Sequence, residues 1–141
     1  MPGRALPVEH LFTLTATLAP AVSIAGPSGT RVIVGVTGGS FEGAKLRGTV
    51  SGVAGGDWLL VRPDGSMQLD VRITLNTDDG ASIYMSYKGI RTVTDGVPAI
   101  RSAPLFETGD ERYAWLNNVQ GVATGTSAAG SVTYEVYALT T

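Results

Sequence analysis

The stretch Met67–Asn76, which reads MQLDVRITLN, determines the fold class. Apolar residues at positions 67, 69, 71, 73 and 75 alternate with polar residues at positions 68, 70, 72, 74 and 76. This period of two is typical of a β-strand with one apolar and one polar face. Two turn sequences flank this strand, Arg-Pro-Asp-Gly at Arg62–Gly65 and Asp-Asp-Gly at Asp78–Gly80. They favour turns because proline fixes φ and glycine accepts a positive φ. Ala81–Lys88 is therefore expected to return as the second strand of a hairpin.

The same alternation recurs along the chain. Between Val8 and Leu18 the even positions are apolar except for His10, and threonines occupy positions 13, 15 and 17. Arg31–Val36 and Ser131–Leu139 are further strands, and we count roughly eight to ten such segments separated by turn signals. The sequence predicts a single all-β domain over 1–141, an antiparallel barrel of lipocalin-like architecture with at most one or two short helices, one of them around 110–114. Closure removes exposed strand edges, although the pattern also fits a sandwich.

Composition excludes several classes of function. The 141 residues include no cysteine and one histidine, His10, so thiolate catalysis and histidine-rich metal sites are excluded, and we expect neither a metal nor a cofactor. His10 is interpreted as a partly buried strand residue. The formal net charge of −2 gives no reason to expect nucleic acid or an anionic membrane as a partner. No apolar run follows the N-terminal Arg4, so a cytoplasmic location is expected.

Two segments invite a functional interpretation and also have a structural one. Gly38–Gly43 resembles a phosphate loop but lacks the Lys-Ser/Thr pair and a following helix, so a turn between strands is the simpler interpretation. Glu42 beside it could still face a pocket. The polar row of Met67–Asn76, which contains Asp70 and Arg72, faces either water or the barrel lumen, and periodicity cannot choose between the two.

Carboxylates and aromatic rings concentrate at Asp57-Trp58 and along Phe106–Asn117. This mixture is typical of a ligand pocket, in which apolar rings surround a few polar groups. The same mixture is equally consistent with ordinary core packing around a carboxylate whose hydrogen bonds are made within the protein. Asp78 and Asp79 are interpreted as turn residues rather than as a catalytic pair.

An ordered set of motifs spans most of the chain and resembles the family known as domain of unknown function 3237. The motifs are Thr37–Gly43, Gly55–Trp58, Arg62–Gly65, Asp70–Arg72, Thr77–Tyr84, Phe106–Gly109 and Tyr113–Asn117. The connection between Gly89 and Phe106 is shorter than is usual in that family, which could alter the barrel mouth. The resemblance implies a small bacterial or fungal β-barrel. One fungal member resembles a cyclase that adds a hydroxyl across an alkene without a redox cofactor, so we expect a small organic molecule inside the barrel and acid/base chemistry.

We therefore expect a cofactor-independent cyclase, isomerase or lyase that acts on a small, partly aromatic metabolite. The candidate acids and bases are Glu42, Asp57, Asp70 and Glu107, and Arg72 is the candidate charge stabiliser. The candidate ligand-binding residues are Trp58, Tyr84, Tyr113, Trp115 and Asn117. Arg72 and at least two of the carboxylates are expected to point into one shared cavity.

Two alternatives stay open, a non-catalytic small-molecule carrier and a structural protein without a site. A cavity with only apolar walls would favour the carrier. A carboxylate near an arginine or a tyrosine inside the cavity would favour the enzyme. A barrel filled with side chains would favour the structural protein. A symmetric homo-oligomer is also expected.

Overall fold

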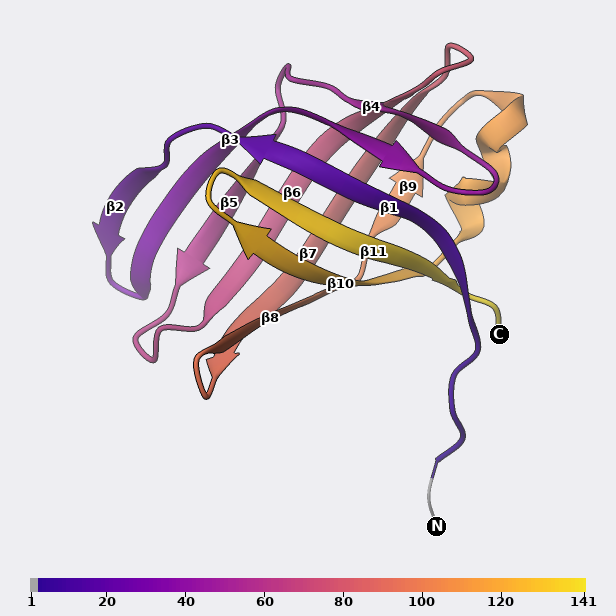
Figure 1. The fold of residues 1–141 in the computed structure, drawn as a ribbon. Helices are drawn as coiled ribbons and strands as arrows, with labels where there is room; N and C mark the ends of the chain where they lie inside the picture. Colours follow the sequence, from indigo (N-terminus) through magenta and orange to yellow (C-terminus); the bar gives the residue numbers. More distant parts are fainter. Residues whose placement is uncertain (1–2) are drawn as a thin grey trace.

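The computed structural model describes residues 3–141, which form one sheet of eleven strands and one short 3₁₀ helix, η1 (Figure 1). The elements are β1 (Val8–Leu18), β2 (Val22–Gly26), β3 (Gly29–Glu42), β4 (Arg47–Val50), β5 (Gly56–Val61), β6 (Met67–Thr77), β7 (Ser82–Thr94), β8 (Val97–Ser102), β9 (Leu105–Glu107), η1 (Glu111–Asn118), β10 (Gly121–Ala128) and β11 (Ser131–Leu139). The predicted all-β class and the short helix are both confirmed.

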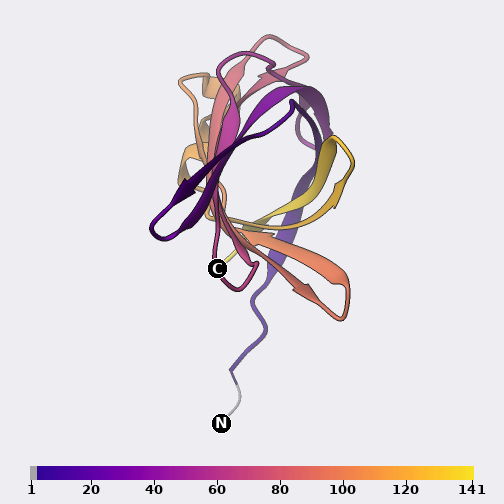
Figure 2. The ribbon, with the colours of Figure 1, turned by 90° about the vertical axis from the view of Figure 1, so that its left-hand side faces the viewer.

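Eight of the strands close into a ring. The hydrogen-bonded order runs β6-β5-β3-β1-β11-β10-β8-β7, and the pairing of β7 with β6 completes the circle. Every pairing in the ring is antiparallel. Figure 2 looks along the ring from one end and shows the strands surrounding a central space. The predicted antiparallel barrel is therefore confirmed.

The interior is packed at one end of the barrel. Phe12 from β1 lies edge-on to Phe41 and Phe106, with ring centroids 5.5 and 6.0 Å apart. Leu116 of η1 is fully buried in the same cluster. The cavity described below lies toward the opposite end, where β1 finishes and β6 begins (Figure 1), and we call this end the mouth of the barrel.

Strand β6 settles which face of the alternation is inside. Leu69, Val71, Ile73 and Leu75 are all at most 4% exposed, while Gln68 and Arg72 are exposed. The polar row thus faces outward, because burial of the apolar row provides the larger stabilisation.

Two local expectations are wrong. A bulge between His10 and Phe12 breaks the alternation in β1, so that Leu11 and Phe12 are both buried and His10 is exposed, with Nε2 2.9 Å from Glu135 Oε1. Gly38–Gly43 is not a turn, because its first residues continue β3. There Gly39 has φ +139°, and a Cβ at this position would clash with the carbonyl oxygen of Thr15, so only glycine lets β1 and β3 approach.

Within residues 3–141, no helix has the length and apolar character needed to cross a membrane. The cytoplasmic location and the homo-oligomer stay predictions.

Candidate functional site in the barrel cavity

The mouth half of the barrel encloses a cavity of about 270 Å³. Its walls are mainly aliphatic and include Leu18, Val34, Leu59, Met67, Ile100 and Val132. Apolar cavities of about 150 Å³ hold a benzene-sized molecule, and ordinary ligand pockets start at roughly 300 Å³. The cavity therefore has room for one ring with a short substituent.

Asp57 brings a carboxyl group into this apolar space. On β5 it lies between two inward-facing valines, opposite Val34 of β3 and Val71 of β6, and its side chain lines the cavity. Oδ1 accepts a hydrogen bond of 3.0 Å from the backbone N–H of Asp70. Burial, together with the nearby Asp70 charge, raises the pKa of Asp57 to about 6 in spite of that hydrogen bond.

Two tyrosines, Tyr87 and Tyr134, line the cavity beside Asp57. They are 6% and 4% exposed, and their rings meet edge-on with centroids 5.3 Å apart. Burial raises the pKa of Tyr134 to about 12, and the Asp57 charge adds to this effect. Burial also raises the pKa of Tyr87, as do the Tyr134 phenol and, more weakly, Asp57. Both phenols therefore stay protonated at neutral pH and can donate hydrogen bonds.

Gly125 of β10 makes the space that the Tyr134 ring occupies. A Cβ at Gly125 would lie 2.6 Å from Cε1 of Tyr134 and 3.3 Å from Cβ of Ile100. The absence of a side chain at this position therefore sets the place of the phenol in the cavity.

Gly125→Ala should displace the Tyr134 ring and lower the free energy of unfolding by about 1–3 kcal/mol, the usual cost of overpacking. Urea unfolding measures the loss, and Gly109→Ala is the control, because nothing lies within 4 Å of a Cβ there. Equal stability of the two variants would contradict the assigned role of Gly125.

The other predicted acids and bases do not reach this cavity, so the expectation of one shared cluster is wrong. Asp70 and Arg72 face outward because the alternating Leu69 and Val71 face inward, and their side chains lie 3.8 Å apart. Glu107 is exposed next to the buried Phe106. Glu42 is exposed next to the buried Phe41 and lies 4.0 Å from Arg47.

The predicted ligand-binding residues also lie outside the cavity. Trp58 faces outward beside Asp57, with the Arg72 guanidinium 5.6 Å from its ring centroid. Tyr84 is 41% exposed on the outside of β7. Trp115 packs under the ammonium group of Lys45, 5.3 Å from the ring centroid.

Asn117 has a structural role. Its side chain accepts a hydrogen bond from the backbone N–H of Thr108 at 2.8 Å and donates one to the Thr108 carbonyl at 2.9 Å. These bonds hold the segment after β9 against η1.

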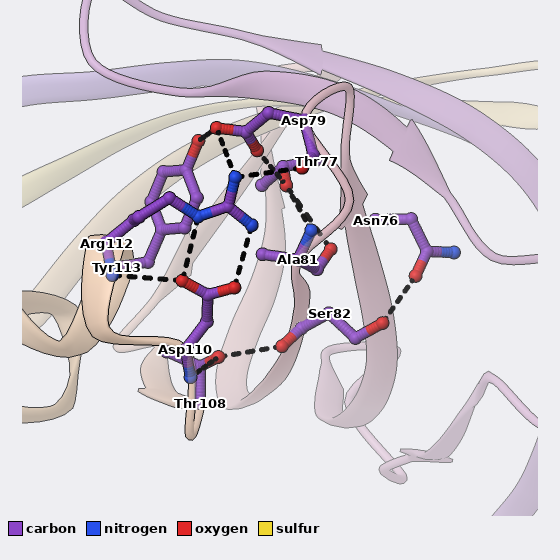
Figure 3. Close-up of polar contacts among 9 residues, drawn as sticks. All are labelled: Asn76, Thr77, Asp79, Ala81, Ser82, Thr108, Asp110, Arg112 and Tyr113. Atoms are coloured by element: carbon purple, nitrogen blue, oxygen red, sulfur yellow. Dashed lines mark hydrogen bonds and ion pairs between the residues drawn. The ribbon is translucent and has the colours of Figure 1, made fainter.

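Tyr113 belongs to a polar network that attaches η1 to the β6–β7 turn (Figure 3). Its hydroxyl donates to Asp79 Oδ2 at 2.7 Å, and this bond is the main reason why the pKa of Tyr113 is raised. Arg112 lies between the two elements, donating to the Asp79 carbonyl at 2.9 Å and to both oxygens of Asp110 at 3.0 and 2.8 Å. Thr77 donates to Asp79 Oδ1 at 2.6 Å. The network explains Asp79 as a turn residue, as the sequence indicated.

Tyr113→Phe should therefore reduce the free energy of unfolding by about 1.5–3 kcal/mol, the usual value of a hydrogen bond to a charged group. Occupation of the cavity should not change, because Tyr113 lies at the other end of the barrel. Thermal unfolding and ligand titration of the same variant check the two expectations. A loss of ligand affinity without a loss of stability would contradict this structural role.

Sequence reasoning missed Tyr87, Tyr134 and Arg91 as cavity residues. The available signal was strand parity. Tyr134 alternates with apolar residues on the buried face of β11, and Tyr87 pairs with the inward-facing Val71. No three histidine, cysteine, aspartate or glutamate side chains in the described part of the chain cluster as a metal site would require.

Comparison with known proteins identifies relatives that match almost the whole chain. The model of the family described as "Protein of unknown function (DUF3237)" matches residues 6–139. A UPF0311 protein of Rhodopseudomonas palustris is 31% identical, with 94% of this chain and 95% of that protein covered. The crystal structure of a β-barrel-like protein of Acinetobacter baumannii is similar over 98% of both chains, with a TM-score of 0.91 and 30% identity.

A fungal relative carries a named activity. The hydroalkoxylation enzyme of Penicillium herquei is 33% identical over 114 residues, which is 79% of this chain and 69% of that protein. An enzyme structure from the same fungus has a TM-score of 0.75 at 25% identity over 99% of both chains.

Proposed function

Because the chain belongs to the DUF3237 family and resembles a fungal hydroalkoxylation enzyme, we propose that its barrel binds a small organic molecule and that Asp57 moves a proton on it. The supporting observation is one carboxyl group, with its pKa raised to about 6, in a cavity whose walls are mainly aliphatic. A group with this pKa is present in both protonation states near neutral pH, which suits it to give and to take protons.

Hydroalkoxylation requires a proton transfer that the Asp57 carboxyl and the two tyrosine hydroxyls could carry out and assist. The reaction adds an O–H bond across a C=C bond, so the oxygen loses a proton, a carbon gains one, and nothing is oxidised or reduced. Asp57 would take the proton from the hydroxyl and deliver one to the alkene carbon. The hydroxyls of Tyr87 and Tyr134 would donate hydrogen bonds to the oxygen as it becomes negative.

A non-catalytic carrier is the alternative. A carrier needs a cavity with apolar walls and no titratable side chain next to the ligand. This cavity instead places Asp57 beside the two phenols of Tyr87 and Tyr134. Burial of that carboxyl carries a cost in stability that a purely apolar cavity would avoid. The arrangement therefore favours the enzyme.

The test uses 2-allylphenol in D₂O as the probe. Proton transfer with ring closure should give the isomeric 2-methyl-2,3-dihydrobenzofuran with one deuterium on carbon, which mass spectrometry detects. Native mass spectrometry of the same sample reports binding. The same experiment is repeated with a panel of alkenyl phenols that fit the cavity. If 2-allylphenol and these compounds bind but none gains deuterium on carbon, the result would support the carrier and overturn the enzyme.

A further inference from the structure

Arg91 brings a second charge into the cavity, at its mouth. On β7 it lies opposite Met67 of β6 and Ile100 of β8, and all three side chains line the cavity. The side chain is half-buried. A guanidinium in this position loses part of its hydration to aliphatic neighbours, which is unfavourable unless an anion compensates for it.

Among the residues that the structure describes, no anion pairs with Arg91. Within residues 3–141, Arg91 forms neither an ion pair nor a side-chain hydrogen bond, whereas six other arginines have a partner. These are Arg31, Arg47, Arg62, Arg72, Arg101 and Arg112. The difference matters because a guanidinium offers five N–H donors in a planar fork that fits a carboxylate.

Asp57 is too deep to neutralise Arg91. The register places Arg91 opposite Met67 and Asp57 opposite Val71, so the two levels differ by four residues along β6. At about 3.3 Å per residue this separation is about 13 Å along the strand. The cavity therefore has a cationic mouth and, above pH 6, an anionic wall further in.

We propose that the cavity takes a small monocarboxylate with an apolar body, whose carboxylate pairs with Arg91 and whose uncharged end reaches Asp57 and the two tyrosines. This inference rests on the proposed function and names its substrate class. The charges also set the orientation of the ligand. The Asp57 carboxylate repels the anionic end and Arg91 attracts it, so the reacting part of the molecule lies beside Asp57.

The test compares 4-phenylbutyrate with its neutral amide, 4-phenylbutyramide, by isothermal titration calorimetry at pH 7.5. The wild-type protein should bind the acid at least about tenfold more tightly than the amide, as expected for a charge-assisted hydrogen bond. Arg91→Met keeps an apolar stem at the mouth and should bind both compounds equally. Arg72→Met removes a cation from the outer face and should keep the preference, and circular dichroism confirms that each variant folds.

The outcomes separate this inference from the proposed function. Equal binding of acid and amide by the wild-type protein, or loss of the preference in Arg72→Met instead of Arg91→Met, would overturn the role of Arg91 and leave the chemistry at Asp57 standing. Asp57→Asn should keep the preference for the acid, since Arg91 is intact. If neither compound binds, nor displaces 2-allylphenol, the substrate class is wrong, and turnover of 2-allylphenol alone then decides the proposed function.

Discussion

Asp57→Asn should increase the free energy of unfolding by about 3 kcal/mol at pH 8 and leave it almost unchanged at pH 4. The folded barrel raises the pKa of this carboxyl from 3.8 to about 6, chiefly through burial. That difference corresponds to about 3 kcal/mol of unfavourable free energy for the ionised form in the folded state. Asparagine keeps an oxygen for the Asp70 N–H and carries no charge to bury.

The sign follows from proton linkage. Above about pH 6 Asp57 is ionised in both states, and the folded state bears the whole cost of burying the charge. Between pH 6 and 3.8 the folded state binds the proton more tightly than the unfolded state, so the wild-type protein regains this stability as the pH falls. Below 3.8 both states are protonated and the cost disappears.

Urea unfolding of wild type and variant at intervals from pH 4 to 8 measures the difference. Asp95→Asn is the matched control, because it removes the same charge from an exposed turn where φ is +52°, a conformation that asparagine also accepts. A constant difference between wild type and Asp57→Asn over this range would show that the carboxyl is not desolvated.

The fold was predictable because its signals are local. The alternation of Met67–Asn76 and the Asp-Gly turn at Asp79 fix a strand and a hairpin without knowledge of the rest of the chain. The eight-strand ring follows from repetition of that pattern, since closure removes exposed edges. The bulge at Leu11 was not predictable from the sequence. Its one extra residue reverses which face of the sheet Val8 and His10 lie on, and no residue type at this position signals a bulge.

The site was harder to predict because inward-facing residues look like core residues. Arg72 and Glu107 attract attention as charges in family motifs, yet strand parity places them outside. Tyr134 reads as a core residue, and its position in the cavity depends on the absence of a side chain at Gly125, a cross-strand neighbour. Asp57 was identified from the sequence, but its neighbour Trp58 faces the other side of the sheet. Successive residues of a strand point to opposite faces, so residues that cluster in the sequence need not share a pocket.

Asp57→Asn should also reduce turnover of an alkenyl phenol by about 10²–10⁴-fold, the usual contribution of general acid–base catalysis. Asparagine fills nearly the same space but can neither take the hydroxyl proton nor deliver one to carbon. The wild-type rate should rise with pH through about 6, because the carboxylate must first accept the proton of the hydroxyl. The variant should lose this dependence along with the rate.

Steady-state kinetics with 2-allylphenol from pH 5 to 8 measure both effects. The loss should appear in kcat while KM changes little, because the role proposed for Asp57 is proton transfer at the reacting atoms. Glu107→Gln, which neutralises an exposed carboxylate outside the cavity, is the control and should keep the wild-type rate and its pH dependence. Equal losses in the two variants, or a pH dependence that persists in Asp57→Asn, would place the proton-transfer group elsewhere. Binding of 2-allylphenol to Asp57→Asn, measured separately, distinguishes a lost proton transfer from a lost site.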